Sequence, residues 1–110
     1  MKTIAIPTDG NEVSQHFGHC PKFYLVTVEG NDIRKKEFID NPGHQPGFLP
    51  VFLNDLGVDC IVAGGMGTRA VGLFRENDIE VITGASGSVD KVVEEYIKGD
   101  LVTEENICDH

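Results

Sequence analysis

The sequence is poor in basic residues: it has 9 Lys and Arg against 18 Asp and Glu, a formal net charge of −9. Nucleic acids and anionic membrane surfaces are bound by clustered Lys and Arg side chains. The composition therefore argues against both as partners. The same charge attracts metal cations, and it repels an anionic ligand unless a local positive patch compensates for it.

Cysteine is also scarce, and its count of three is odd: Cys20, Cys60 and Cys108. An odd count does not suit a disulfide framework, so we expect ligands or core residues in a reduced, cytoplasmic setting. The chain begins directly with an apolar stretch and shows no n-region or cleavage site of a signal peptide. No stretch reaches the length of a transmembrane helix, so we also expect no membrane partner.

Hydrophobic residues make up 40% of the 110 residues, which is enough for one core without disulfides. The sequence shows no internal repeat and no second domain. We predict a single domain over residues 1–101. The remainder, residues 102–110, has no periodicity, so we predict an acidic flexible tail that carries Cys and His.

Short apolar, β-branched and aromatic runs predict five strands, at residues 3–8, 23–29, 33–39, 60–63 and 80–83. Apolar residues at helical spacing predict three helices, at residues 48–56, 68–76 and 89–98. Their alternation predicts an α/β fold with three α/β/α layers. We expect a mixed five-stranded sheet of order 3-2-1-4-5 with strand 2 antiparallel. The lysines of the third strand suit a sheet edge.

In such sheets ligands bind beyond the carboxyl ends of the parallel strands, near the point where the strand order reverses. The loops at residues 9–22 and 64–67 leave the two strands that flank this point. We therefore expect these loops to converge. The first loop contains the run His16-Phe17-Gly18-His19-Cys20, and the second is the turn Gly64-Gly65-Met66-Gly67.

Imidazole and thiolate groups are suited to zinc, copper, iron or a metal–sulfur cluster. The candidate metal ligands are His16, His19, Cys20, His44, Cys108 and His110. The alternative is that the histidines lie on the surface beside a Phe17 anchor and a semi-buried Cys20. Cys60 falls within a predicted central strand, where a structural thiol is expected.

The glycine turn allows close approach of backbone to a ligand and opens a helix, whose first N–H groups favour an anion. Arg69 lies in the first turn of that helix and adds positive charge. The alternative is a tight turn in which glycine serves geometry alone, because the run is neither a dinucleotide-binding fingerprint nor a P-loop.

Two enzyme classes find little support. A two-metal nuclease would need further carboxylates around Asp9, and the other acidic residues fall elsewhere in the predicted fold. A cysteine hydrolase built on Cys20 lacks an identifiable Asn or Asp partner and an oxyanion loop.

Several motifs in order along the chain resemble the dinitrogenase iron–molybdenum cofactor biosynthesis family, of the NifX and NifB C-terminal domain type. They are IAIPTDG from Ile4, Ser14-x-His16-Phe17-Gly18, Asn41-Pro42 with His44, GGMGTRA from Gly64, TGASG from Thr83 and the closing Cys108-Asp109-His110. The resemblance covers essentially the whole chain. It implies a ribonuclease-H-like fold.

The resemblance also implies a non-enzymatic binding or carrier protein for an iron–molybdenum or other molybdenum-containing metal–sulfur cluster. Its partners would be donor and acceptor proteins, and the chain would be a monomer or homodimer. By position, the cluster surface would involve the histidine–cysteine run, His44, the glycine turn and Arg69, with Cys108 and His110 as tail ligands. The competing hypothesis is a regulatory or interaction module that binds a small anion or a protein at the glycine turn, without metal.

Overall fold

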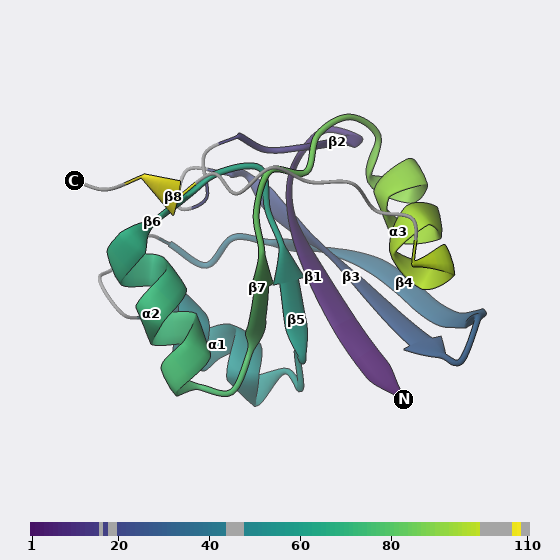
Figure 1. Cartoon of the computed structure of the whole chain (residues 1–110), viewed down its shortest axis with the longest axis horizontal. Helices are drawn as coiled ribbons and strands as arrows, with labels where there is room; N and C mark the ends of the chain where they lie inside the picture. The colour runs from purple at the N-terminus through teal and green to yellow at the C-terminus, as the bar shows by residue number, and fades with distance from the viewer. Residues whose placement is uncertain (16, 18–19, 44–47, 100–106, 109–110) are drawn as a thin grey trace.

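The computed structural model describes residues 1–15, 17, 20–43 and 48–99, and the backbone of residues 107–108. Its centre is a mixed sheet whose main path has the order β4-β3-β1-β5-β7 (Figure 1). These strands are β1 (Lys2–Asp9), β3 (Lys22–Glu29), β4 (Asp32–Asp40), β5 (Cys60–Val62) and β7 (Glu80–Ile82).

The pairing of these strands confirms the predicted order 3-2-1-4-5 along the main path, but the sheet has six strands and not the five predicted, because a further short strand pairs with β1. β3 is antiparallel to both of its neighbours, β1 and β4, whereas β1–β5 and β5–β7 are parallel pairs. The reversed strand is therefore the second of the five, as expected. β4 lies at one end of the path, and its residues Arg34, Lys35 and Lys36 are exposed, as an edge strand requires.

Helices cover both faces of the sheet and complete the three predicted layers. α1 (Phe48–Asp55) and α2 (Thr68–Glu76) lie on one face, and α3 (Val89–Lys98) lies on the other (Figure 1). Two separate clusters of buried residues fill the spaces between the layers. One contains Leu53 of α1 and Phe74 of α2, and the other contains Val92 and Val93 of α3.

The bounds of α3 follow from local sequence chemistry. Val89, Val92 and Val93 repeat at helical spacing and are buried against the sheet. Ser88 occupies the N-cap position, although its side chain makes no capping hydrogen bond. Gly99 ends the helix with a φ of 76°, a left-handed conformation that glycine adopts without steric cost.

Three two-residue strands occur where the sequence predicts only loops and a tail: β2 (Glu12–Val13), β6 (Met66–Gly67) and β8 (Ile107–Cys108). β2 pairs antiparallel with β1, and β6 pairs in parallel with β8. Two residues are too few to show a period-2 pattern, so the sequence does not predict these strands. The predicted flexibility of the other tail residues stays a prediction, because residues 100–106 and 109–110 lie outside the description.

Candidate functional site at the carboxyl edge of the sheet

Buried polar side chains gather at the carboxyl ends of β1 and β7. In the described part of the chain, the residues of this kind are Thr8, Ser14 and Thr83. Thr8 lies near the carboxyl end of β1, and its hydroxyl donates a hydrogen bond to the main-chain oxygen of Lys22 at 3.2 Å. Polar groups are retained in an interior when they are hydrogen-bonded, so this edge is chemically distinct from the apolar remainder of the core.

The loop after β1 and the glycine turn after β5 meet at this edge, as predicted. The Ser14 N–H donates to the main-chain oxygen of Pro7 at 2.8 Å, which turns the chain back over the sheet. A Cβ built on Gly64 would stand 2.8 Å from the Ser14 main-chain oxygen and 2.8 Å from Gln15 Nε2. Glycine is therefore required at position 64, because the other loop lies directly against it.

A third loop joins the same edge. The Val13 N–H donates to Gly87 O at 2.9 Å, and the Val89 N–H donates to Asn11 O at 2.9 Å, so β2 holds the segment that leads into α3. On the other side, the Gly84 N–H donates to Gly64 O at 2.8 Å. Three loops that are distant in sequence thus form one continuous surface.

Phe17 is the one residue of the 16–19 segment that the structure describes. Its ring packs against Phe23 and Phe74, with centroids 6.2 Å and 5.3 Å away, and the second contact is edge-to-face. This placement matches the anchor role considered above, and its predicted contact with a cofactor stays a prediction. His16, Gly18, His19 and His44 lie outside the described residues.

Cys20 is buried, with 2% of its surface exposed, and it belongs to the core between the sheet, α1 and α2. Asn41 Nδ2 donates to the Cys20 main-chain oxygen at 2.8 Å and lies 3.8 Å from Sγ. Burial raises the pKa of the Cys20 thiol to about 11, so the thiol is protonated at neutral pH. A metal ligand must be the thiolate, so this arrangement must open before Cys20 can bind a metal.

The glycine turn is part buried and part open. Gly64 and Gly65 are buried, and Met66 is 2% exposed and belongs to the α1/α2 core, so its side chain fills the interior. Gly67 is exposed and is the N-cap residue of α2, where it offers no side chain to cap the helix. Arg69 lies exposed in the first turn of α2, so positive charge is concentrated at this end of the helix.

The C-terminal strand β8 reaches the same turn. It pairs Ile107 with Met66 and Cys108 with Gly67. The backbone of Cys108 therefore lies beside the N-terminus of α2, although the two are 41 positions apart in the sequence. His110 lies outside the described residues.

A metal-ion site is not complete within the described residues, where no three His, Cys, Asp or Glu side chains gather closely enough to hold an ion. Of the predicted ligands, Cys20 is the one whose side chain is described. Cys60 is fully buried on the opposite face of the sheet, as predicted for a structural thiol, with its Sγ 3.7 Å from Glu80 Oε1.

Comparison with known proteins identifies the family of the chain. A family model described as dinitrogenase iron-molybdenum cofactor matches residues 1–99. The chain belongs to this family. The family indicates a function related to the iron–molybdenum cofactor, and the three-layer fold is the one that members share.

Individual relatives agree with this assignment. The chain is 33% identical over 106 residues to the protein MJ0580 of Methanocaldococcus jannaschii, covering 92% of this chain and 90% of that one. The crystal structure of PH0822 superposes with a TM-score of 0.88 at 33% identity, over 93% and 94% of the two chains. The apo form of the orange protein from Desulfovibrio gigas superposes with a TM-score of 0.77, over 96% of this chain and 95% of that one. At 21% identity, the likeness to the orange protein shows the fold alone.

Sequence reasoning did not single out four polar residues near this edge: Ser14, Gln15, Asn41 and Thr83. Ser14 and Thr83 are buried at the edge, Gln15 lies against Gly64, and Asn41 holds Cys20. Ser14 and Asn41 are the first residues of two motifs that carry the family resemblance, and these motifs were the signal by which the sequence could have identified them. Gln15 and Thr83 are recognisable only once the three loops are brought together.

In the described part of the chain, no helix has the length and apolar character needed to cross a membrane.

Proposed function

We propose that this protein binds and carries a metal–sulfur cluster, of the iron–molybdenum type or a related molybdenum-containing type, without catalysing a reaction. The observation that carries the proposal is the close approach of the Ser14 main-chain oxygen and the Gln15 side chain to Gly64. This contact joins the start of the loop that contains the histidine–cysteine run to the glycine turn before α2, in a chain of the iron–molybdenum cofactor family. The cluster is cargo here, and it would be received from one protein and delivered to another.

The charge distribution supports this location for an anionic cargo. The chain carries a net charge of −9, so a cluster with sulfido or oxo groups needs local positive potential. Lys22 is already paired with Asp40, at 3.4 Å, and contributes little. Arg69 and the N-terminus of α2 therefore supply the positive potential at the described part of the site.

The buried state of Cys20 sets an order of events for binding. The cluster first meets other groups of the proposed ligand set, with His16 as the leading candidate. Cys20 binds the cluster after its hydrogen bonds with Asn41 break and the thiol loses its proton. His19, His44, Cys108 and His110 complete the proposed ligand set. Cargo held by loops is suited to release, because loops open at a lower free-energy cost than the sheet.

The test is cluster uptake by the full chain. The protein is purified without oxygen under reducing conditions and incubated with tetrathiomolybdate and ferrous iron. Bound molybdenum and iron are then measured together with the visible spectrum. We expect uptake that falls about tenfold in a His16→Ala/Cys20→Ala variant, because the ligand bonds are lost.

The matched control for that variant is Cys60→Ala, which removes an equally buried thiol from the opposite face of the sheet. It should bind as the parent protein does. Absence of uptake by the parent protein would contradict the carrier function. Equal uptake by the parent and the double variant would show that the cluster binds elsewhere on the protein.

A second function is favoured by the protonated, buried state of Cys20 together with the exposed N-cap Gly67. In this alternative, the glycine turn binds a small anion or a protein and metal has no role. Molybdate without iron or sulfide distinguishes the two functions. Simple anion binding would shift the backbone amide resonances of residues 67–69 and would be lost in Arg69→Gln, while His16→Ala/Cys20→Ala would bind normally.

The proposal includes a reduced, cytoplasmic location and a monomeric or homodimeric chain. Donor and acceptor proteins are its expected partners. Nucleic acids are not expected to bind, because the chain carries a net charge of −9 and binding to phosphates needs clustered Lys and Arg side chains.

A further inference from the structure

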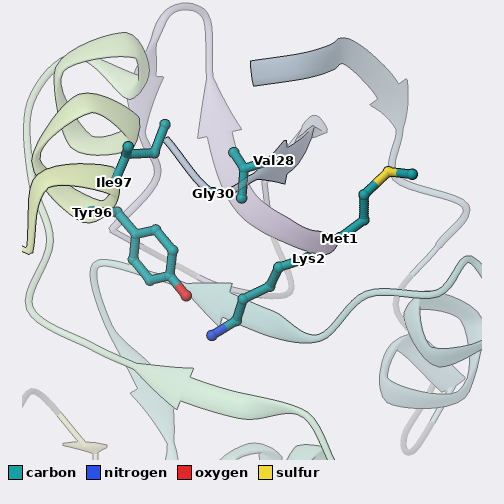
Figure 2. Close-up of a pocket in the computed structure, with 6 residues that line it drawn as sticks. All are labelled: Met1, Lys2, Val28, Gly30, Tyr96 and Ile97. Atoms are coloured by element: carbon teal, nitrogen blue, oxygen red, sulfur yellow. The ribbon is translucent and has the colours of Figure 1, made fainter. Parts of the chain in front are cut away.

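A surface pocket opens at the start of β1, at the end of the sheet opposite the candidate site (Figure 2). It has a volume of about 430 Å³ and is lined by Met1, Lys2, Val28, Gly30, Tyr96 and Ile97. The volume falls within the range of small-molecule sites, roughly 300–1,000 Å³. β1 has eight residues, so its two ends lie about 23 Å apart and a ligand here would not touch the carboxyl edge.

Lys2 gives the pocket a positive charge. Four other basic side chains of the described residues form ion pairs, whereas no described carboxylate lies within ion-pairing distance of Lys2. Its Nζ lies 5.5 Å from the centroid of the Tyr96 ring. Contact with the Tyr96 hydroxyl raises the pKa of Lys2, so the ammonium group stays charged at neutral pH.

The Tyr96 hydroxyl lies beside the Lys2 ammonium group and also contacts the Cys60 thiol. It points toward the Lys2 amine (Figure 2). Burial raises the pKa of Tyr96, so the phenol keeps its proton. The ammonium group has three N–H donors and no acceptor, so the polar side of the pocket is rich in donors. Donors of this kind favour a ligand whose polar end is an acceptor.

The rest of the lining is apolar. Met1, Val28 and Ile97 contribute a thioether and two aliphatic side chains around the Tyr96 ring. A ligand that fits both sides has one acceptor group and a short hydrocarbon body. We propose that this pocket is a second binding site, which takes a small organic monoanion: a carboxylate with a short apolar chain.

The surrounding charge favours one negative charge over two. Glu80 is close enough to contribute to the raised pKa of Lys2, and it opposes additional negative charge. Tyr96 and Ile97 belong to the last turn of α3, where the helix carries partial negative charge. The Lys2 ammonium group can balance one carboxylate, and the neighbouring negative charge makes a second charge on the ligand less favourable. The pocket therefore differs in ligand class from the anion-favouring end of α2.

The test uses hexanoate as the probe, with hexylamine and hexanol as ligands of matched length. Each is titrated into the isotope-labelled full chain at neutral pH, and backbone amide resonances are followed. We expect hexanoate to shift residues 2, 28–30 and 96–97 and to leave residues 64–69 unchanged. Hexanol should bind about tenfold more weakly, because it lacks the charge-assisted hydrogen bond. Hexylamine should bind more weakly still.

Variants test the role of Lys2 directly. Lys2→Met keeps an unbranched side chain of similar length without the charge, and it should weaken hexanoate binding about tenfold. Lys2→Arg should retain most of the affinity. The control is Lys91→Met, which removes one exposed charge from α3 outside the pocket and should bind as the parent does. Equal binding of the three ligands by the parent, shifts confined to other residues, or unchanged affinity in a folded Lys2→Met protein would each overturn the proposal.

Discussion

The main-chain oxygen of Ser14 lies 2.8 Å from the position that a Cβ on Gly64 would occupy. Real Cβ atoms do not approach a backbone oxygen this closely, so the two loops could not keep their present separation around any other residue. This contact is the reason that the loop after β1 and the glycine turn meet at one edge of the sheet.

The first prediction is that Gly64→Ala destabilises the protein and separates the loops. Backbone must move to admit the methyl group, so the free energy of unfolding should fall by about 1–3 kcal/mol, as for overpacked cores. Urea unfolding measures this loss. Gly72→Ala is the control, because Gly72 lies within α2 with nothing within 4 Å of an added Cβ. That change should stabilise the protein by about 0.5–1 kcal/mol. Equal stability of Gly64→Ala and the parent would contradict the close contact.

The second prediction concerns alkaline pH. Burial raises the pKa of Cys20 to about 11 and that of Cys60 to about 12, from an ordinary thiol value near 9. The folded state therefore holds these protons more tightly than the unfolded state. The associated stability is complete below pH 9 and is lost as the pH rises toward 11 and 12. Each thiol contributes at most about 1.4 kcal/mol per pH unit in this window.

Unfolding in urea at pH 8 and pH 10 measures this loss of stability, and Cys20→Ala should reduce the difference between the two values. A parent protein that is equally stable at both pH values would show that the thiols are not held in their neutral form.

The third prediction is slow modification of Cys20 in the native state. The thiol is 2% exposed and protonated at pH 7.5, so iodoacetamide should label it far more slowly than in urea. Asn41→Ala removes the 2.8 Å hydrogen bond to the Cys20 main chain and should speed labelling of Cys20. Cys60 serves as the internal control, since Asn41 does not touch it. Mass spectrometry of the digested protein locates the label, and parallel acceleration at both cysteines would indicate general unfolding instead.

The fourth prediction concerns β8. Deleting the chain from Asn106 removes the partner of Met66 and Gly67, so hydrogen exchange at these two amides should become faster. The amides of β1 that pair with β3 should keep their protection, because that ladder does not involve the tail. Unchanged exchange at β6 would show that β8 contributes no protection there. The same truncated protein, tested for cluster uptake, reports whether Cys108 and His110 are ligands.

Most of the sheet and all three helices were predictable because their patterns are long. β1 and β3 each contain a nearly continuous run of buried residues, and α3 has apolar residues at helical spacing. The convergence of the two loops was also predictable, since it depends only on where the parallel strands end. β2, β6 and β8 were not, because a two-residue strand is defined by its partner and not by its own side chains.

The candidate site was predicted less completely than the fold. The sequence identifies Cys20 as a possible ligand, but its side chain packs in the core beside α1 and α2. Asn41, which lies 21 positions away, donates a hydrogen bond to its main-chain oxygen. Met66 is part of the turn that is predicted to approach a ligand through its backbone, and its side chain fills the core beside α1 and α2. Both outcomes result from packing between distant segments, which periodicity in one segment cannot report.

The pairing of β1 with β5 has a consequence for biosynthesis. β1, β3 and β4 pair as antiparallel neighbours within residues 2–40. Ile4 and Ala5 of β1 can pair with Cys60 and Ile61 of β5 only after those later residues have been synthesised. Chains fold from the N-terminus as they emerge, and long-range parallel pairing is slow. The histidine–cysteine loop is therefore synthesised before the glycine turn. The surface on which the two loops meet forms only after Gly67 has been added to the chain.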